Sequence, residues 1–588
     1  MHGVMRDRGL WTAVVVLAAL GAAVTWPLLR APATTTLDAW FAPSQLWTMD
    51  ILARGLLEEG RLIGETTMVA WPGGGYLSIV GWSYLPLLVP AQLLGFGTAA
   101  ALHVGIWLQL IGAGLACFLL ARRLGASQSS ALAVGCLYGI HPFALHQLMN
   151  GQFTELCHWG PPLLALLLLR LRERPSWRPL AGMAVGFGLL VSSSPYSAAT
   201  ALLIVAALGG WMVWSSPGER GKVAGLLALT AAAMLLGGAP FVLYFVVLPG
   251  DSELLLYPNQ LSPVEILYRS ENPNAALRGW VLPWRLQQLL PAQVDGAGLA
   301  LPPANASTKE FALGWLSLGL AGLGLARWVH PTSPAPRLPG PRFWLLPALG
   351  CALVASGHYL MLGPGQPVML AGRLIPLPLL ALWYAAPASQ AFASTYRVAL
   401  GVLLCVALLS ALGLDVLLAR VGGWRRTGLA AVATAALVGE GLLLDSTSHP
   451  LPTLDIRPLQ VHLDLAAMDD DGTVLDVPWW PTHAIPNPQI YVYWQSVHHH
   501  PLHHTELGMV PENQPTDFVL GLEQAANIKR PDLGFSSSHE PPAHWIIVHT
   551  EALEHHRRQA VLDYVEAHGT LEHSYPEDGV SLYRVDTP

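Results

Sequence analysis

Long apolar runs recur along this chain and restrict its fold more than any other feature. The first is GLWTAVVVLAALGAAVTWPLL, and ten more follow. As helices, runs of about 20 apolar residues span the roughly 30 Å hydrocarbon core of a bilayer. Of 588 residues, 53% are hydrophobic and only 12% are charged, unlike a soluble protein of this size. The sequence therefore predicts a polytopic α-helical membrane protein with about 11 transmembrane helices. The predicted spans are residues 11–29, 98–121, 127–147, 158–171, 178–195, 197–214, 222–248, 311–329, 342–362, 398–420 and 427–445.

Clusters of basic residues between the spans indicate the orientation of the chain. With eleven spans all of these clusters fall on one side, which the positive-inside rule makes cytoplasmic, together with the N-terminus. This count requires that the apolar stretch from Tyr76 to Gly97 does not cross the membrane, and we expect it to lie in the outer interface. The clusters are Arg6 and Arg8, Arg122 and Arg123, Arg170 to Arg178, Arg220 and Lys222, Arg327 with Arg337 and Arg342, and Arg420 with Arg425 and Arg426.

The chain divides into two domains by composition. Residues 1–445 form the predicted transmembrane domain, with outer loops 30–97 and 249–310. Residues 446–588 contain no span and are predicted to form an extracytoplasmic α/β or α+β domain. The predicted strands are GTVLDVPWW, QIYVYWQSV, HWIIVHT and VSLYRVD, and the predicted helix is EALEHHRRQAVLDYVEAHG.

Asp38 opens the first outer loop and is the carboxylate nearest to the first span on this side. Its simplest interpretation is a helix cap or a solvated loop residue. The alternative is a catalytic carboxylate at the membrane surface. Asp50 lies further along the same loop, where we expect it on the polar face of an amphipathic helix over residues 43–58.

The order of several short motifs resembles the GT-C superfamily of membrane glycosyltransferases, and within it a largely uncharacterised bacterial subgroup. After the first-loop acid come the turn and span LLARRLGASQSSALAVGCLYGIHPF, then HPFALHQLMNGQFTELCHWGPP, the span entry FASTYRVALG, and YVYWQSVHHHPLHHTELG in the tail. The resemblance implies a multi-pass protein of the bacterial cytoplasmic (inner) membrane that uses a polyprenyl-phosphate-linked sugar as donor. It also implies an extracytoplasmic glycan, lipid or protein as acceptor. Nothing in the sequence suggests nucleic acid as a partner.

The resemblance also assigns roles to individual residues. Asp38 would be the base that takes the acceptor proton, giving inversion in a single displacement. The predicted topology, rather than the resemblance, points to Arg397 as the residue that binds the donor phosphate, since it lies at the outer start of a span, with Arg269, Arg278 and Arg285 as further candidates.

Three more side chains are candidates for binding the acceptor or a metal ion: Glu155, His158 and Asp50. The competing interpretation of Glu155 and His158 is a solvated turn. Because no second acid stands beside Asp38, the use of a divalent metal such as Mg or Mn stays open.

Beyond residue 460 the tail carries 14 of the 22 histidines, including the run HHHPLHH at residues 498–504. Its spacing is compatible with a metal site, but we interpret it as a loop that packs against the membrane domain.

The sequence is therefore compatible with two functions from different classes. One is a glycosyltransferase, and the other is a non-catalytic GT-C-like scaffold or a protein that handles lipid-linked glycans. Convergence of Asp38, Glu155 and an arginine on an outward cavity that opens laterally to lipid would favour the enzyme, whereas an Asp38 that points to bulk water away from any pocket would favour the scaffold.

Overall fold

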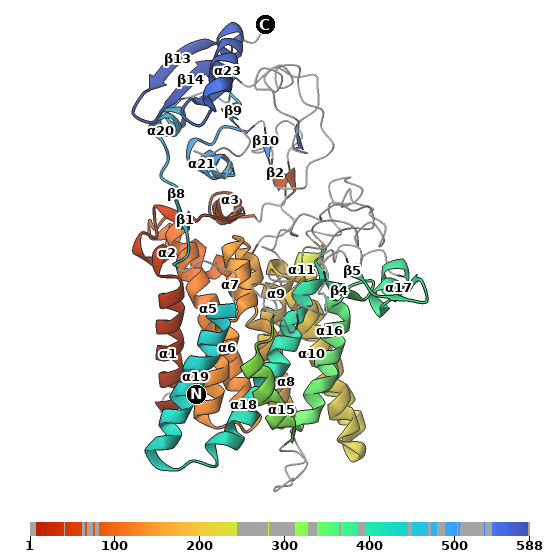
Figure 1. Cartoon of the computed structure of the whole chain (residues 1–588). Helices are drawn as coiled ribbons and strands as arrows, with labels where there is room; N and C mark the ends of the chain where they lie inside the picture. Colours follow the sequence, from red (N-terminus) through yellow and green to blue (C-terminus); the bar gives the residue numbers. More distant parts are fainter. Residues whose placement is uncertain are drawn as a thin grey trace.

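The computed structural model shows a bundle of helices with a smaller C-terminal domain at one end (Figure 1). It describes residues 8–39, 41–61, 65–66, 75–76, 81–243, 280, 312–326, 338–363, 366–385, 394–444, 450–468, 472–478, 489–502, 504–505, 534–535 and 544–585.

Each of the eleven predicted spans coincides with one or two helices in the described part of the chain. Five of the helices, α5, α10, α11, α18 and α19, are long and apolar enough to cross a membrane by length and composition. The prediction of a multi-pass helical membrane protein is confirmed. The helices of the bundle are α1 (Arg8–Val24), α2 (Trp26–Arg30), α5 (Thr98–Arg123), α6 (Gln128–Gly139), α7 (Pro142–Met149), α8 (Gly160–Glu173), α9 (Trp177–Ser193), α10 (Pro195–Trp214), α11 (Arg220–Val242), α15 (Trp315–Ala326), α16 (Leu345–Ala355), α17 (Pro378–Ala385), α18 (Leu400–Leu418) and α19 (Gly423–Leu444).

One predicted span, 127–147, is divided into α6 and α7. Pro142 has no N–H to donate to the preceding turn, so α6 ends before it and a new helix begins there. The His141 side chain caps α7 by accepting a hydrogen bond from the N–H of Ala144 at 3.2 Å. The helical path therefore breaks close to the end of the bundle that carries the C-terminal domain.

The opposite end of the bundle gathers several of the basic turns. An ion pair between Arg123 and Glu173 joins the ends of α5 and α8. Arg172 donates to the hydroxyl of Ser216 after α10, at 2.9 Å. Asp415, near the end of α18, accepts from the N–H of Ser127 at the start of α6, at 2.9 Å. This separation of basic turns from the C-terminal domain is the arrangement that the charge pattern predicts.

The first outer loop contains short elements that do not cross the bundle. Strand β1 (Thr35–Leu37) pairs antiparallel with β8 (Thr453–Asp455), and α3 (Ala42–Arg54) follows, extended by a π-helical turn to Glu59. Two short strands, β2 (Glu65–Thr66) and β3 (Gly75–Tyr76), pair with each other. Helix α4 (Leu85–Leu93) has nine residues. At a rise of 1.5 Å per residue it is about 14 Å long, too short to span a bilayer.

The C-terminal domain is built on a mixed sheet of four strands in the order β13-β14-β12-β9. Only β12 and β9 are parallel. The apolar side chains of one face pack against α23, and those of the other pack toward α20 and the first outer loop. The elements are α20 (Gln460–Ala466), β9 (Val474–Val477), α21 (Ile490–His498), β12 (Trp545–His549), α23 (His555–His568), β13 (Thr570–Tyr575) and β14 (Val580–Arg584).

One prediction for this domain was wrong, and one strand of the sheet was not predicted. The stretch QIYVYWQSV, predicted as a strand, forms helix α21. A short apolar run does not distinguish a strand from a buried helix, and Ile490, Tyr491, Val492 and Trp494 are all buried. Strand β13 was missed because five of its six residues are exposed. A strand with so few buried positions shows no alternation of apolar and polar residues in its sequence. The other three strands and α23 form where the sequence predicts them.

Candidate functional site

Asp38 lies in the short connection between β1 and α3. Its backbone N–H donates to the carbonyl of Pro452 at 3.0 Å, next to the pairing of β1 with β8. The residue is exposed. Among the described residues its carboxylate forms no ion pair and no hydrogen bond. A fixed backbone therefore presents a free carboxylate at the junction of the bundle and the C-terminal domain.

The turn after α7 packs against this connection. The N–H of Phe41 donates to the carbonyl of Asn150 at 3.4 Å. Gly151 has a φ of +69°, and a Cβ atom there would lie 2.3 Å from the backbone nitrogen of Ala42. Only glycine allows both this conformation and this approach. The Asp38 connection and the turn after α7 are thus in direct backbone contact.

Four residues further on, Glu155 forms a buried ion pair with Arg397. The distance from Glu155 Oε1 to Arg397 Nη1 is 2.6 Å, and the two side chains are 3% and 12% exposed. Arg397 Nη2 donates to Gln152 Oε1 at 2.7 Å, and Ser194 donates to the second oxygen of Glu155. The guanidinium also lies 5.0 Å from the ring centre of Tyr196.

The structure therefore brings together two predicted site residues, Glu155 and Arg397, but as partners of each other. Glu155 does not occupy a solvated turn, because its carboxylate is fully used by Arg397 and Ser194. His158 is also buried, with its ring 5.5 Å from those of Tyr138 and His141. The solvated-turn interpretation was wrong for both residues.

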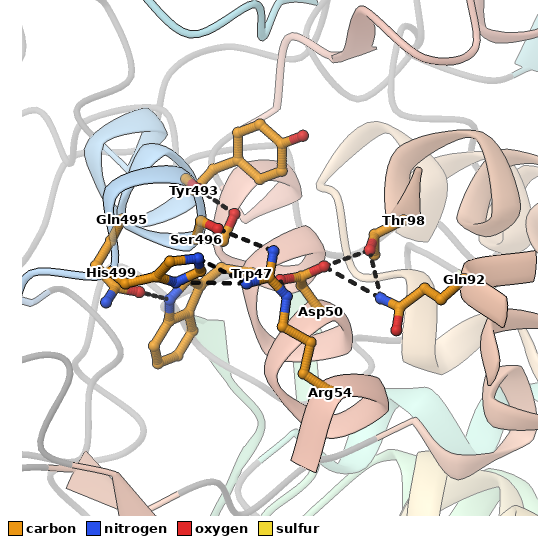
Figure 2. A network of polar contacts seen from close by, with 9 residues as sticks. All are labelled: Trp47, Asp50, Arg54, Gln92, Thr98, Tyr493, Gln495, Ser496 and His499. Carbon is orange, nitrogen blue, oxygen red and sulfur yellow. Dashed lines mark hydrogen bonds and ion pairs between the residues drawn. The ribbon is translucent and has the colours of Figure 1, made fainter. Parts of the chain in front are cut away.

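Asp50 lies at the centre of a second polar network (Figure 2). Its carboxylate pairs with Arg54 Nε at 2.8 Å, and accepts hydrogen bonds from Thr98 and from Gln92, the latter at 3.2 Å. Burial raises the pKa of Asp50, and Arg54 opposes this shift. The predicted exposed polar face was wrong at this residue, since Asp50 is only 6% exposed.

The same network reaches the C-terminal domain through α21 (Figure 2). Trp47 Nε1 donates to Gln495 Oε1 at 2.6 Å, and both side chains are buried. Arg54 donates to the carbonyl of Ser496 at 3.0 Å, and its Nη1 lies 2.9 Å from His499 Nε2. The predicted contact of the histidine run with the membrane domain is present at His499.

The other histidines of that run that the structure describes, apart from His504, are buried inside the C-terminal domain. His500 contacts the carbonyl of Gly472 at 2.8 Å, and the ring of His498 stacks on that of His462 at 5.8 Å. Burial alone would raise the pKa of Asp476, but the side chains of His462 and His549 outweigh it and lower that pKa. His549 Nε2 lies 3.1 Å from Asp476 Oδ1.

The described residues do not fit a metal ion. No group of three or more His, Cys, Asp or Glu side chains is arranged to hold one within these parts of the chain. Glu155 and Asp50 are each committed to an arginine, in two separate networks. Arg269, Arg278 and Arg285 lie outside the described residues, as does loop 249–310 except for Trp280.

A cleft of about 870 Å³ opens in the C-terminal domain beside β8. The carboxylates of Asp455, Glu577 and Asp578 line it, together with one cation, Arg457. Residues of β8 line this cleft, and β8 pairs with β1, the strand that Asp38 follows directly.

Sequence reasoning missed several polar residues of both networks. Ser194 and Tyr196 carry no motif that separates them from ordinary span residues, whereas Gln152 stands inside the motif HPFALHQLMNGQFTELCHWGPP but was not singled out. Arg54 had a local signal, because it follows Asp50 by four positions on a helix. Gln495 stood inside a motif but was taken for part of a strand.

Comparison with known proteins adds similarity at the level of the fold. No protein-family model and no curated protein matches the chain. The archaeal oligosaccharyltransferase AglB from Archaeoglobus fulgidus, in complex with an inhibitory peptide and a dolichol-phosphate, has a TM-score of 0.51 at 12% identity. This match covers 99% of this chain and 74% of AglB.

Two cryo-EM structures of the arabinofuranosyltransferase AftD from Mycobacteria are also similar. A mutant form has a TM-score of 0.55 at 16% identity, and another structure has 0.52 at 14%. They cover 98% and 99% of this chain but only 41% and 40% of AftD. The chain therefore has the architecture of GT-C glycosyltransferases over nearly its full length, and spans less than half of AftD.

Proposed function

We propose that this GT-C-fold protein is a membrane glycosyltransferase. It moves a sugar from a polyprenyl-phosphate-linked donor to an extracytoplasmic acceptor, by a single inverting displacement with Asp38 as the base. The bundle crosses the bacterial cytoplasmic membrane with the basic turns inside and the C-terminal domain outside. The observation that carries this proposal is the position of Asp38, a free carboxylate on a backbone held by both domains of a GT-C architecture.

The reaction requires a base for the acceptor and compensation of charge on the leaving phosphate. Asp38 serves the first need. Arg397 serves the second, since its contacts with Glu155, Gln152 and Tyr396 use three of its five N–H donors and leave two for phosphate oxygens. Arg269 and Arg285 of the second outer loop are further candidates for this role.

The acceptor approaches from the C-terminal domain. The cleft beside β8 contains three carboxylates and one arginine, so its lining favours neutral or cationic acceptors over anionic ones. Carboxylate oxygens accept hydrogen bonds from hydroxyl groups, which suits a glycan acceptor. No step through a metal ion is part of this proposal.

The test is a transfer assay in membranes that contain equal amounts of the protein or a variant. The release of polyprenyl phosphate is measured from a panel of radiolabelled polyprenyl-phosphate sugars, with cell-envelope extract as the source of acceptors. The matched control for Asp38→Asn is Asp563→Asn, which changes an exposed carboxylate on α23.

We expect release by the wild type and by Asp563→Asn, and a loss of at least 100-fold in Asp38→Asn. Equal release by all three proteins would remove Asp38 from the mechanism. The absence of release with every donor would favour the alternative, a GT-C-like scaffold or a handling protein for lipid-linked glycans.

A further inference from the structure

Asp38 is flanked on both sides by elements that are attached to the C-terminal domain. On its N-terminal side, all three residues of β1 pair with β8, and the N–H of Asp38 itself extends this pairing to Pro452. On its C-terminal side, α3 packs against α21. The two attachments lie on opposite sides of a connection of four residues, 38–41.

One face of α3 makes the second attachment. Trp47, Asp50 and Arg54 follow each other at spacings of three and four residues, which places them on the same side of a helix. Figure 2 shows these side chains between α21 on one side and Gln92 and Thr98 on the other. The face therefore joins the bundle to the C-terminal domain.

The contacts of this face are hydrogen bonds and an ion pair, whose geometry fixes how α3 and α21 are oriented relative to each other. Gln495 accepts from Trp47 and donates its Nε2 to the carbonyl of His500 at 3.3 Å, so the side-chain amide is used at both ends. Arg54 bridges Asp50 and the carbonyl of Ser496. Replacing Gln495 or Arg54 leaves a buried polar group without its partner. The resulting loss of stability is larger than the contribution of the hydrogen bond itself.

We propose that the junction of α3 with α21 positions Asp38 for catalysis, with Trp47, Arg54 and Gln495 as positioning residues. The inference rests on the proposed function, in which Asp38 is the base. It makes the C-terminal domain part of the catalytic apparatus, because both attachments of the Asp38 connection belong to that domain. A displacement of about 1 Å at a catalytic group can reduce turnover about 100-fold.

The test compares three variants, Trp47→Phe, Gln495→Leu and Arg54→Gln, with the matched control Arg557→Gln. Arg557 also pairs with a nearby carboxylate, that of the N-cap residue Glu554 at 3.3 Å, but lies on α23 away from the junction. All are full-length proteins in detergent. Two quantities are measured: kcat and donor KM in the transfer assay, and hydrogen exchange of peptides covering residues 35–42.

We expect each junction variant to lower kcat by 10-fold or more, with donor KM within about 2-fold of wild type. Exchange of residues 35–42 should rise in these variants and stay unchanged in Arg557→Gln. Unchanged kcat per folded molecule, or a fall that merely follows a loss of folded protein, would overturn the proposal.

The exchange measurement does not depend on activity. If no donor supports transfer, the proposed function fails, and faster exchange in the variants would still show that the junction orders the Asp38 connection. Unchanged protection of residues 35–42 in all three variants would show that the junction does not position Asp38.

Discussion

At the residue scale, the predicted site consists of charges that differ in their surroundings. The carboxylate of Asp38 is exposed, while those of Glu155 and Asp50 are buried and each paired with an arginine. A buried carboxylate that already has an arginine and hydrogen bonds is poorly suited to take a proton from an acceptor. The roles of Glu155 and Asp50 are therefore to hold Arg397 and Arg54, and Asp38 alone among the three has the freedom of a base.

The Glu155–Arg397 pair leads to a prediction about stability. Glu155→Gln keeps the shape of the side chain but leaves the buried Arg397 uncompensated, so we expect the free energy of unfolding to fall by about 3 kcal/mol. Arg397→Gln should cost a similar amount, and the double variant less than the sum of both. Reversible unfolding in mixed micelles measures all three. Additive effects would mean that the two side chains do not stabilise each other.

At the element scale, short connections carry most of the site. The turn at Gly151 contacts the start of α3, α7 begins at a proline after a histidine cap, and α21 packs on α3. None of these contacts lies inside one of the five long helices. The bundle provides the frame, and the site depends on how its short connections meet.

Gly151 allows this dependence to be tested. In Gly151→Ala the new Cβ meets the backbone of Ala42, whereas in the control Gly60→Ala, at a φ of +66°, it meets nothing within 4 Å. Gly60→Ala should lower the free energy of unfolding by about 1 to 2 kcal/mol, the cost of a left-handed non-glycine residue. Gly151→Ala should cost more and also lower transfer activity. Equal costs would contradict the close packing of the two turns.

The buried histidines of α20 and α21 predict a dependence on pH. Burial lowers the pKa of His462 in spite of Asp476, and burial with the neighbouring His462 lowers the pKa of His498. Both therefore take up a proton at a lower pH in the folded domain than in the unfolded chain, where histidine protonates near pH 6.5. Below that pH the unfolded state binds more protons, so the stability of the domain falls by up to about 1.4 kcal/mol per pH unit for each histidine.

Hydrogen exchange of the full-length protein between pH 8 and 5.5, corrected for intrinsic rates, measures this slope in the C-terminal sheet. His462→Gln should flatten it, and the control His568→Gln, an exposed histidine of α23, should not. A sheet whose stability does not depend on pH would contradict the lowered pKa of these histidines.

At the scale of the whole molecule, the candidate base lies at the seam between two domains, on the side away from the basic turns (Figure 1). In the proposed reaction a lipid-linked donor would arrive from the membrane and an acceptor from outside, so both could meet at a seam at the bundle end. This position also explains why β1, near the N-terminus, pairs with β8 more than 400 residues later.

The proposed orientation predicts the labelling of single cysteines by a membrane-impermeant maleimide. All five native cysteines are buried. Ala567→Cys on α23 should react in intact spheroplasts, whereas Gly218→Cys, in the exposed turn before α11, should react only after permeabilisation. Reaction of both sites in intact spheroplasts would refute the orientation.

The sequence by itself determined the elements whose signal is local. Apolar length predicted where helices lie, and the structure has helices at each of the eleven predicted ranges, five of them long and apolar enough to cross a membrane. Alternation and β-branched residues identified three of the four sheet strands. Apolar length and alternation are properties of one continuous segment, so they can be read directly from the sequence.

Only the tertiary structure decided which charges are free and which are paired. Glu155 and Arg397 are separated by 242 positions, and Trp47 and Gln495 by 448. Their contacts arise when the ends of several helices meet, and no periodicity within a segment encodes that meeting. The same reason applies to α21, which forms as a helix where α3 covers one side of it and the sheet domain another.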